Sequence, residues 1–294
     1  MKLFGRSKFK LIRFITAVAV VATAVSCKQY SASEKPYAVE SSQSQVAKAN
    51  SLKILLPLYI YPNWYEPDNY TWSQVVTAAK QVPIVAIINP NNGPDGNPPN
   101  EDYARGLEDL KQADVTTIGY VYTLYGDRPI AEVKRDIDLY YQYFGVQGIF
   151  LDESASNVAK IDYYQDIYRY IKAKGDRELV VINPGTHTDR EYITRPAADT
   201  SVIFENYSHA WGEYQPRPYV DSNKSKHFAS LIHSVRDAAT MKSHLDKAVE
   251  RNIGYIYITD DSPDRDDGDP WNSLPPYWQE EVDYVRDLNN TKSD

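Results

Sequence analysis

The sequence predicts a single (β/α)8 barrel, and two observations point to it. Eight short apolar runs, rich in β-branched and aromatic residues, recur between residues 53 and 261 of the 294-residue chain. Segments with helical periodicity separate most of them, so strands and helices alternate over about 240 residues. A doubly wound open sheet is the alternative, but no glycine-rich dinucleotide fingerprint follows the first run.

The predicted strands are nearly continuous in apolar character, as is typical of strands buried on both faces of a parallel sheet. They span residues 53–61, 83–90, 116–123, 148–153, 178–185, 201–207, 227–234 and 254–261. Helical periodicity is strong in segments 101–113, 131–144, 161–174, 236–252 and 277–289, and weaker in 72–80, 189–198 and 208–220. Gly175 and Gly254 follow two of these segments and indicate where the helices stop.

The first 50 residues are expected to precede the barrel domain, which we predict to span residues 51–294. Residues 1–26 begin with basic side chains and contain an apolar run at 15–25, too short for a membrane span and typical of an export signal. The run leads into "AVSC", which resembles a bacterial lipobox and makes Cys27 a candidate for lipidation. Cleavage and release without lipid is the alternative. Residues 27–50 are polar and are predicted to form a flexible tether.

These features predict an exported protein, either a cell-envelope lipoprotein or a secreted one. Removing residues 1–26 leaves 27 Lys and Arg against 40 Asp and Glu, a net charge of −13, which argues against nucleic acid as a partner. Cys27 is the only cysteine, so no disulfide is expected. The 25 tyrosines offer flat apolar faces with a hydroxyl, which suit a wet binding surface, while most of them are expected to be half-buried strand residues. We expect a monomer without a cofactor, whose only membrane attachment is through Cys27.

Two carboxylates stand out where predicted strands end, the position at which (β/α)8 barrels carry their active sites. Asp152 follows "GIFL" and Glu205 follows "SVIF", with no turn residue between. Side-chain alternation points both acids into the barrel mouth and points Glu153 the other way, unless the strand has already bent. Paired carboxylates are what glycoside hydrolysis needs. For either acid alone, a salt bridge or a loop cap is the ordinary alternative.

The strand ends and the loops after them also carry side chains suited to binding a sugar chain, because aromatic faces stack on sugar rings and sugar hydroxyls need polar partners. The predicted substrate-binding residues are Tyr59, Tyr61, Trp64, Asn89, Tyr122, Asn183, Asn206, Trp211 and Asp260. Trp271 is a further aromatic candidate. Other chemistries find less support: the five histidines lack metal-ligand spacing, the acidic loop 260–271 does not fit an EF-hand, and no G-x-S-x-G occurs. No metal site is therefore predicted.

Six motifs, in order between residues 53 and 261, resemble those of the spherulin-4-like proteins, which include glycoside hydrolase family 135. They are "LLPLYIYP", "VAIINPNNGPDGNPP", "IGYVYTLYGDRP", "GIFLDE", "VVINPGT" and "VIFENY". The resemblance implies a (β/α)8 barrel and, for the enzymatic members, an endo-acting glycosidase that cuts α-1,4-linked polymers containing N-acetylgalactosamine, such as galactosaminogalactan. The family's acids match Asp152, Glu153 and Glu205. Bacterial relatives associated with exopolysaccharide systems make a biofilm polymer the expected substrate.

The resulting hypothesis is a retaining hydrolysis by two carboxylates. Aspartic acid ionises at lower pH than glutamic acid in model peptides, so Asp152 is the expected nucleophile or charge stabiliser. Glu205 lies next to Ile203 and Phe204, whose apolar surroundings favour an acid/base role. Glu153 is expected to tune one of these acids or to bind the sugar. The alternative is a non-catalytic surface lipoprotein that binds polysaccharide in the same groove.

Overall fold

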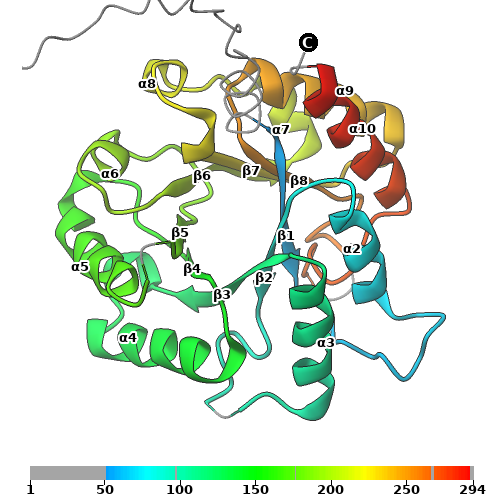
Figure 1. The fold of residues 1–294 in the computed structure, drawn as a ribbon. Coiled ribbons are helices and arrows are strands. Elements are labelled where there is room, and N and C mark those ends of the chain that lie inside the picture. Colours follow the sequence, from blue (N-terminus) through cyan, green and yellow to red (C-terminus); the bar gives the residue numbers. More distant parts are fainter. Residues whose placement is uncertain (1–50, 97, 176, 266–267, 292–294) are drawn as a thin grey trace, which may run out of the picture. The chain divides into compact units, whose positions relative to one another are not determined.

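The protein forms a closed barrel of eight parallel strands in a computed structural model that describes residues 51–96, 98–175, 177–265 and 268–291 (Figure 1). The strands are β1 (Lys53–Leu58), β2 (Ile84–Ile88), β3 (Thr116–Tyr122), β4 (Gly148–Asp152), β5 (Leu179–Ile182), β6 (Thr200–Tyr207), β7 (Phe228–His233) and β8 (Tyr255–Ile258). They follow one another around the barrel in sequence order, and β8 closes on β1. The predicted (β/α)8 barrel is confirmed, and the open-sheet alternative is excluded.

Helices surround the barrel on its outside (Figure 1). The longer ones are α2 (Thr71–Ala79), α3 (Glu101–Gln112), α4 (Ile130–Leu139), α5 (Ile161–Lys172), α9 (Ala238–Glu250) and α10 (Trp278–Thr291). The segments with weaker periodicity between β5 and β7 form only the short helices α6 (Glu191–Thr194), α7 (Ser208–Glu213) and α8 (Pro218–Asp221). Short helical turns are η1 (Leu124–Gly126), η2 (Tyr140–Phe144), η3 (Val158–Lys160) and η4 (Ser225–His227).

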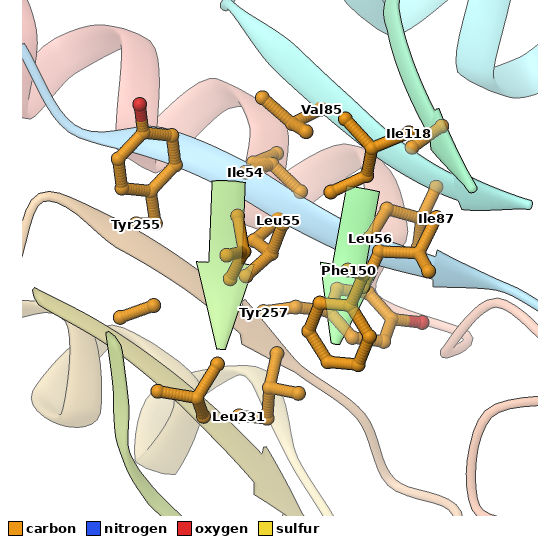
Figure 2. Packing of buried hydrophobic residues seen from close by; sticks show 14 of the residues in the cluster. Ile54, Leu55, Leu56, Val85, Ile87, Ile118, Phe150, Leu231, Tyr255 and Tyr257 are labelled. Atoms are coloured by element: carbon orange, nitrogen blue, oxygen red, sulfur yellow. The ribbon is translucent and has the colours of Figure 1, made fainter. Parts of the chain in front are cut away.

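The strands are apolar on both faces because one face lines the barrel interior and the other packs under the helices. β2 and β8 are buried along their whole length. Figure 2 shows apolar side chains from β1, β2, β4, β7 and β8 packed together, among them Ile54, Ile87 and Phe150. The longer helices complete the outer layer with one apolar face each. On α5 the buried residues are Ile161, Tyr164, Ile167 and Ile171, at the spacing of three and four residues that one helix face requires.

One glycine on β3 sets the direction of the side chains that follow it. A Cβ atom at Gly119 would overlap the ring of Tyr140, which packs over the outside of the strand. The Tyr140 hydroxyl donates to the backbone oxygen of Ile88 on β2 (2.9 Å), which holds the ring in that place. Because side chains alternate along a strand, the next residue, Tyr120, points into the barrel.

Three of the sequence predictions lie outside the described residues: the export signal at 1–26, the lipidation of Cys27 and the tether at 27–50. They stay predictions. Among the described residues, none of the helices is long and apolar enough to cross a bilayer.

Candidate active site

β4 brings Asp152 to the mouth of the barrel. Tyr120 and Phe150 are register partners on β3 and β4, and their rings stack with centroids 6.3 Å apart. Asp152 follows Phe150 by two residues and therefore points to the same side of the sheet. The Tyr120 hydroxyl donates to Oδ2 of Asp152 (2.7 Å), which fixes the carboxylate from the interior side.

β6 brings Glu205 to the same mouth. The pairing of β6 with β7 shifts register between Val202 and Phe204, in the middle of the strand, so that Ile203 has no register partner on β7. Phe204 faces the helices, since its ring packs against Trp211 and Tyr214 with centroids 4.9 Å from each. Glu205 therefore faces the interior, as the alternation argument predicted.

One amide, that of Asn183 just after β5, connects the two acids. Its Nδ2 donates to Oδ1 of Asp152 (2.8 Å) and to Oε2 of Glu205 (2.6 Å). Its Oδ1 accepts from the backbone N–H of Gly185 (3.0 Å), which fixes which end of the amide faces the acids. The two donor–acceptor distances, 2.8 and 2.6 Å, limit the separation of the two carboxylate oxygens to 5.4 Å.

Glu205 is the acid whose titration is displaced. Its pKa is raised from 4.5 to about 7, first because burial disfavours the ionised form and second because the charge of Asp152 is nearby. Hydrogen bonds from Asn183 and Trp271 act in the opposite direction, since they favour the ionised form. A carboxyl group that titrates near neutral pH can both give and take a proton, which is the property of a general acid/base.

Two tyrosines form the wall of the site beside Asp152. The ring of Tyr59, just after β1, meets that of Tyr120 edge-on, with centroids 5.8 Å apart. Burial raises the pKa of both hydroxyls, and the charge of Asp152 raises it further, so both remain protonated donors. Sequence reasoning included Tyr59 but missed Tyr120, which reads as a core aromatic. The one available signal was that Tyr120 precedes Tyr122 by two residues, so both side chains point to the same side of β3. Tyr122 is the register partner of Asp152 on β4.

Glu153 lies where the chain bends away from β4. Its φ is +48°, a left-handed conformation that is strained for a residue with a side chain. Its backbone oxygen accepts from the N–H of Tyr125 (2.6 Å) and from Oγ1 of Thr123 (2.8 Å), which hold this bend. The negative charge of Glu153 contributes to the raised pKa of Tyr120, so its carboxylate lies near the site. The alternation argument placed Glu153 away from the mouth unless the strand had already bent, and the positive φ shows that the chain does bend at this residue.

Within the part of the chain that the structure describes, Oε2 of Glu153 is buried and accepts no hydrogen bond. A buried carboxylate oxygen without a donor is costly. The charge of Glu153 acts on Tyr120, which suits its expected role in tuning the neighbouring acid.

Of the next four predicted binding residues, two are exposed and two lie beside the β2–α3 loop. Tyr61 and Trp64 lie on the β1–α2 loop with 45% and 41% of their surface exposed. Asn89, after β2, accepts from the N–H of Gly93 (2.9 Å) and so shapes the β2–α3 loop. Tyr122 lies under the guanidinium of Arg128, 4.0 Å from the ring centroid, and both line a pocket of about 560 Å³ beside residues 91–96.

The remaining predictions have different outcomes. Asn206 is exposed, and its Oδ1 accepts from the neighbouring N–H of Tyr207 (2.8 Å). Asp260 is half-buried and pairs with Arg265 (3.4 Å). The prediction of a sugar platform at Trp211 is wrong, because this α7 residue has 0% exposure and its Nε1 donates to the backbone oxygen of His244 on α9 (3.2 Å). Its position after a strand resembled that of a loop residue, but a short helix carries it back into the core.

Trp271 contacts Glu205, and His233 packs against Trp271. Trp271, proposed from the sequence as a sugar platform, is only 7% exposed and instead hydrogen-bonds Glu205. His233, at the end of β7, meets the rings of Trp271 and Tyr207 edge-on, with centroids 6.1 and 4.4 Å away. Burial lowers the pKa of His233, which favours its neutral form. In the described ranges, no group of three or more His, Cys, Asp or Glu residues is placed to hold a metal ion.

A (β/α)8 barrel with two linked carboxylates at its mouth defines a glycoside-hydrolase-like, polysaccharide-active class of protein, and comparisons with known proteins identify the family. Residues 53–285 match the family described as Spherulation-specific family 4. The chain is 34% identical to Spherulin-4 of Physarum polycephalum over 249 residues, which is 81% of this chain and 71% of that protein. The chain belongs to this family, as the resemblance predicted.

A solved structure supports the same relationship. It is Sph3 of Aspergillus clavatus in complex with GalNAc, which is 27% identical to this chain and superposes with a TM-score of 0.68. The match covers 81% of this chain and 98% of Sph3, so the whole barrel is shared.

Proposed function

We propose that the protein is an endo-acting glycoside hydrolase that cleaves a polysaccharide containing N-acetylgalactosamine with retention of anomeric configuration. The observation that carries the proposal is the pair of carboxylates linked by Asn183. Two acids at the mouth of a barrel, one of them titrating at about 7, supply the nucleophile and the acid/base that this reaction needs.

We assign a different role to each acid. Protonated Glu205 donates its proton to the glycosidic oxygen while a carboxylate oxygen of Asp152 bonds to the anomeric carbon and the leaving sugar departs. Glu205, now ionised, takes a proton from water, and that water displaces Asp152 and frees the second product. Tyr120 and Asn183 hold the Asp152 carboxylate for attack.

The separation of the acids favours retention over inversion. Retaining glycosidases hold their carboxyl groups about 5–5.5 Å apart, whereas inverting enzymes leave about 6.5–9.5 Å for a water molecule. The limit of 5.4 Å applies to the two oxygens that Asn183 holds, and this closeness of the acids is our reason for proposing retention.

The choice of substrate rests on the family and on the surface around the acids. Sph3, which shares the barrel, was crystallised with GalNAc. Exposed aromatic side chains on the mouth loops, such as Tyr61 and Trp64, suit the faces of sugar rings. For the same reasons we propose a biofilm exopolysaccharide as the natural polymer. We also propose that the protein is an exported monomer and that Cys27 carries lipid after cleavage of residues 1–26.

The test is cleavage of galactosamine-rich exopolysaccharide by the purified protein, measured as new reducing ends. Asp152→Asn and Glu205→Gln should each abolish cleavage while the variants remain folded by circular dichroism. Asp246→Asn is the matched control, because it makes the same change of charge on α9, where Asp246 only accepts from Tyr284 among the described contacts. NMR of the first product should show the anomer of the substrate.

The alternative, a non-catalytic polysaccharide-binding protein, predicts a different result. In that case the polymer would be bound but no reducing ends would form at any pH between 4 and 8. Full activity of Asp152→Asn would overturn the assignment of the nucleophile.

A further inference from the structure

Three exposed aromatic side chains lie together on the β1–α2 loop. Tyr61, Trp64 and Tyr65 expose 45%, 41% and 55% of their surface, and they are half of the large hydrophobic residues that are exposed in the described chain. The rings of Trp64 and Tyr65 meet edge-on with centroids 6.2 Å apart. Burial does not explain these side chains, because large aromatic residues gain little stability when they remain in water.

A single carboxylate holds two of the three rings in place. Oδ2 of Asp102, in the first turn of α3, accepts from the Tyr61 hydroxyl (2.5 Å), and its Oδ1 accepts from Nε1 of Trp64 (2.8 Å). The amide of Asn100 also donates to the Tyr61 hydroxyl (3.0 Å), and the Arg105 guanidinium lies 5.6 Å from the centre of the Trp64 ring. The polar atoms of both rings are therefore satisfied within the protein, and their remaining exposed surface is apolar.

This geometry is that of a preorganised binding surface. A ring that is already fixed loses little conformational entropy when a ligand stacks on it, which is why rigid aromatic residues are effective in recognition. We define Tyr61, Trp64 and Tyr65, together with Asp102, as the aromatic shelf.

The occupant of the shelf follows from its continuity with the catalytic mouth. Tyr59 packs against Tyr120, which hydrogen-bonds Asp152, and Tyr61 follows Tyr59 by two residues. Successive Cα atoms are about 3.8 Å apart, so the shelf begins within about 8 Å of the wall of the site. A polymer bound across the acids can extend onto it.

The neighbouring charges argue against a membrane as the occupant. Glu66, Asp68 and Glu101 lie on or next to the shelf in sequence and would repel an anionic lipid surface. Flat rings with acidic surroundings instead suit a neutral or cationic sugar chain, which is the composition of a galactosamine-containing polymer.

We propose that the aromatic shelf is a remote sugar-binding subsite that selects long polymer chains over short ones, with Asp102 as its positioning residue. The inference rests on the proposed glycosidase function for its catalytic readout. The aromatic shelf is a subsite away from Asp152 and Glu205. A sugar-binding role explains why the β1–α2 loop holds exposed aromatic rings in fixed orientations.

The kinetic test compares Trp64→Ala with the parent on galactosamine-rich exopolysaccharide and on its disaccharides and trisaccharides. We expect kcat/KM on the polymer to fall about tenfold, mainly through KM, with the short substrates unaffected. Asp102→Ala should give a smaller loss of the same kind, since the rings remain but are no longer held. Equal losses on long and short substrates, or no loss on the polymer, would overturn the subsite.

Tyr284→Ala is the matched control, because Tyr284 also donates to an aspartate, Asp246 (2.8 Å), but lies on α10 in the outer helix layer. It should leave the preference for long chains unchanged.

A binding arm separates the subsite from the proposed catalysis. The full-length protein is run through native gels that contain the exopolysaccharide. If the parent is retarded and Trp64→Ala is retarded less, the shelf binds sugar even when no reducing ends appear, and only the glycosidase function fails. If Trp64→Ala and the parent migrate alike, whether or not the polymer slows them, the subsite is refuted.

Discussion

Replacing Glu205 with glutamine should stabilise the fold at alkaline pH and have little effect at acid pH. In the unfolded chain a glutamic acid titrates near 4.5, whereas in the folded protein the pKa of Glu205 is about 7. A group whose pKa is raised by folding contributes stability below its unfolded pKa, and that contribution is lost as the pH rises through the folded value. The window is therefore pH 4.5 to 7.

The magnitude follows from the same two values. The difference between 4.5 and about 7 corresponds to about 3 kcal/mol of unfolding free energy that the ionised carboxylate costs above pH 7. Glutamine has nearly the same shape but carries no charge at any pH, so Glu205→Gln avoids this cost. The stability difference between variant and parent should grow by up to about 3 kcal/mol between pH 4 and pH 8.

The assay is urea unfolding of both proteins at pH 4 and at pH 8, with matched m-values as the sign that the folded states are alike. Two further variants identify the cause. Asp152→Asn should reduce the gain from Glu205→Gln, because the charge of Asp152 is the second reason for the raised pKa. Glu281→Gln should also gain stability over the parent between pH 4 and pH 8, because burial alone raises the pKa of Glu281 on α10. A difference between Glu205→Gln and parent that is the same at both pH values would refute the reasoning.

Three other changes test separate parts of the structure. Asn183→Ala should move the alkaline limb of the kcat/KM profile up by about 1–2 pH units, because an ionised carboxylate loses a charge-assisted hydrogen bond; an unmoved limb would contradict this. Trp211→Ala should lower the unfolding free energy by about 3–5 kcal/mol in urea titrations, and a stable variant would contradict its core position. Gly119→Ala should cost about 1–3 kcal/mol by overlap with Tyr140, whereas Gly212→Ala, which meets no close atom, should not; equal effects would count against the overlap.

The barrel was predictable from the sequence because its signal is local. Strands buried on both faces read as continuous apolar runs, and the end of each run lies within a few residues of the strand end in the structure. The direction of Asp152 was also predictable, because side chains alternate along β4 and Phe150 shows the phase. Glu205 faces the interior as predicted, but the register shift between Val202 and Phe204 interrupts the alternation along β6, and the sequence does not show that shift.

The sequence was less informative where tertiary contacts decide the outcome. Glu153 departs from alternation because backbone hydrogen bonds to the β3–α4 loop hold it at positive φ, and no residue type in "DES" announces that bend. Trp211 was misplaced because α7 turns its ring under Arg251, whose guanidinium lies 4.5 Å from the ring centre. Tyr120 was missed because only the register between β3 and β4 shows that its hydroxyl reaches Asp152.

The contacts also explain why two similar acids can take different roles. Asn183 gives one N–H to each carboxylate, so its hydrogen bonds do not distinguish them. Asp152 accepts a second bond from the Tyr120 hydroxyl, so both of its carboxylate oxygens are held in place. Glu205 also accepts from Trp271, but burial and the charge of Asp152 outweigh its donors. Because its pKa is raised to about 7, Glu205 can hold a proton near neutral pH, which fits the acid/base role, while the fixed carboxylate of Asp152 fits the role of nucleophile.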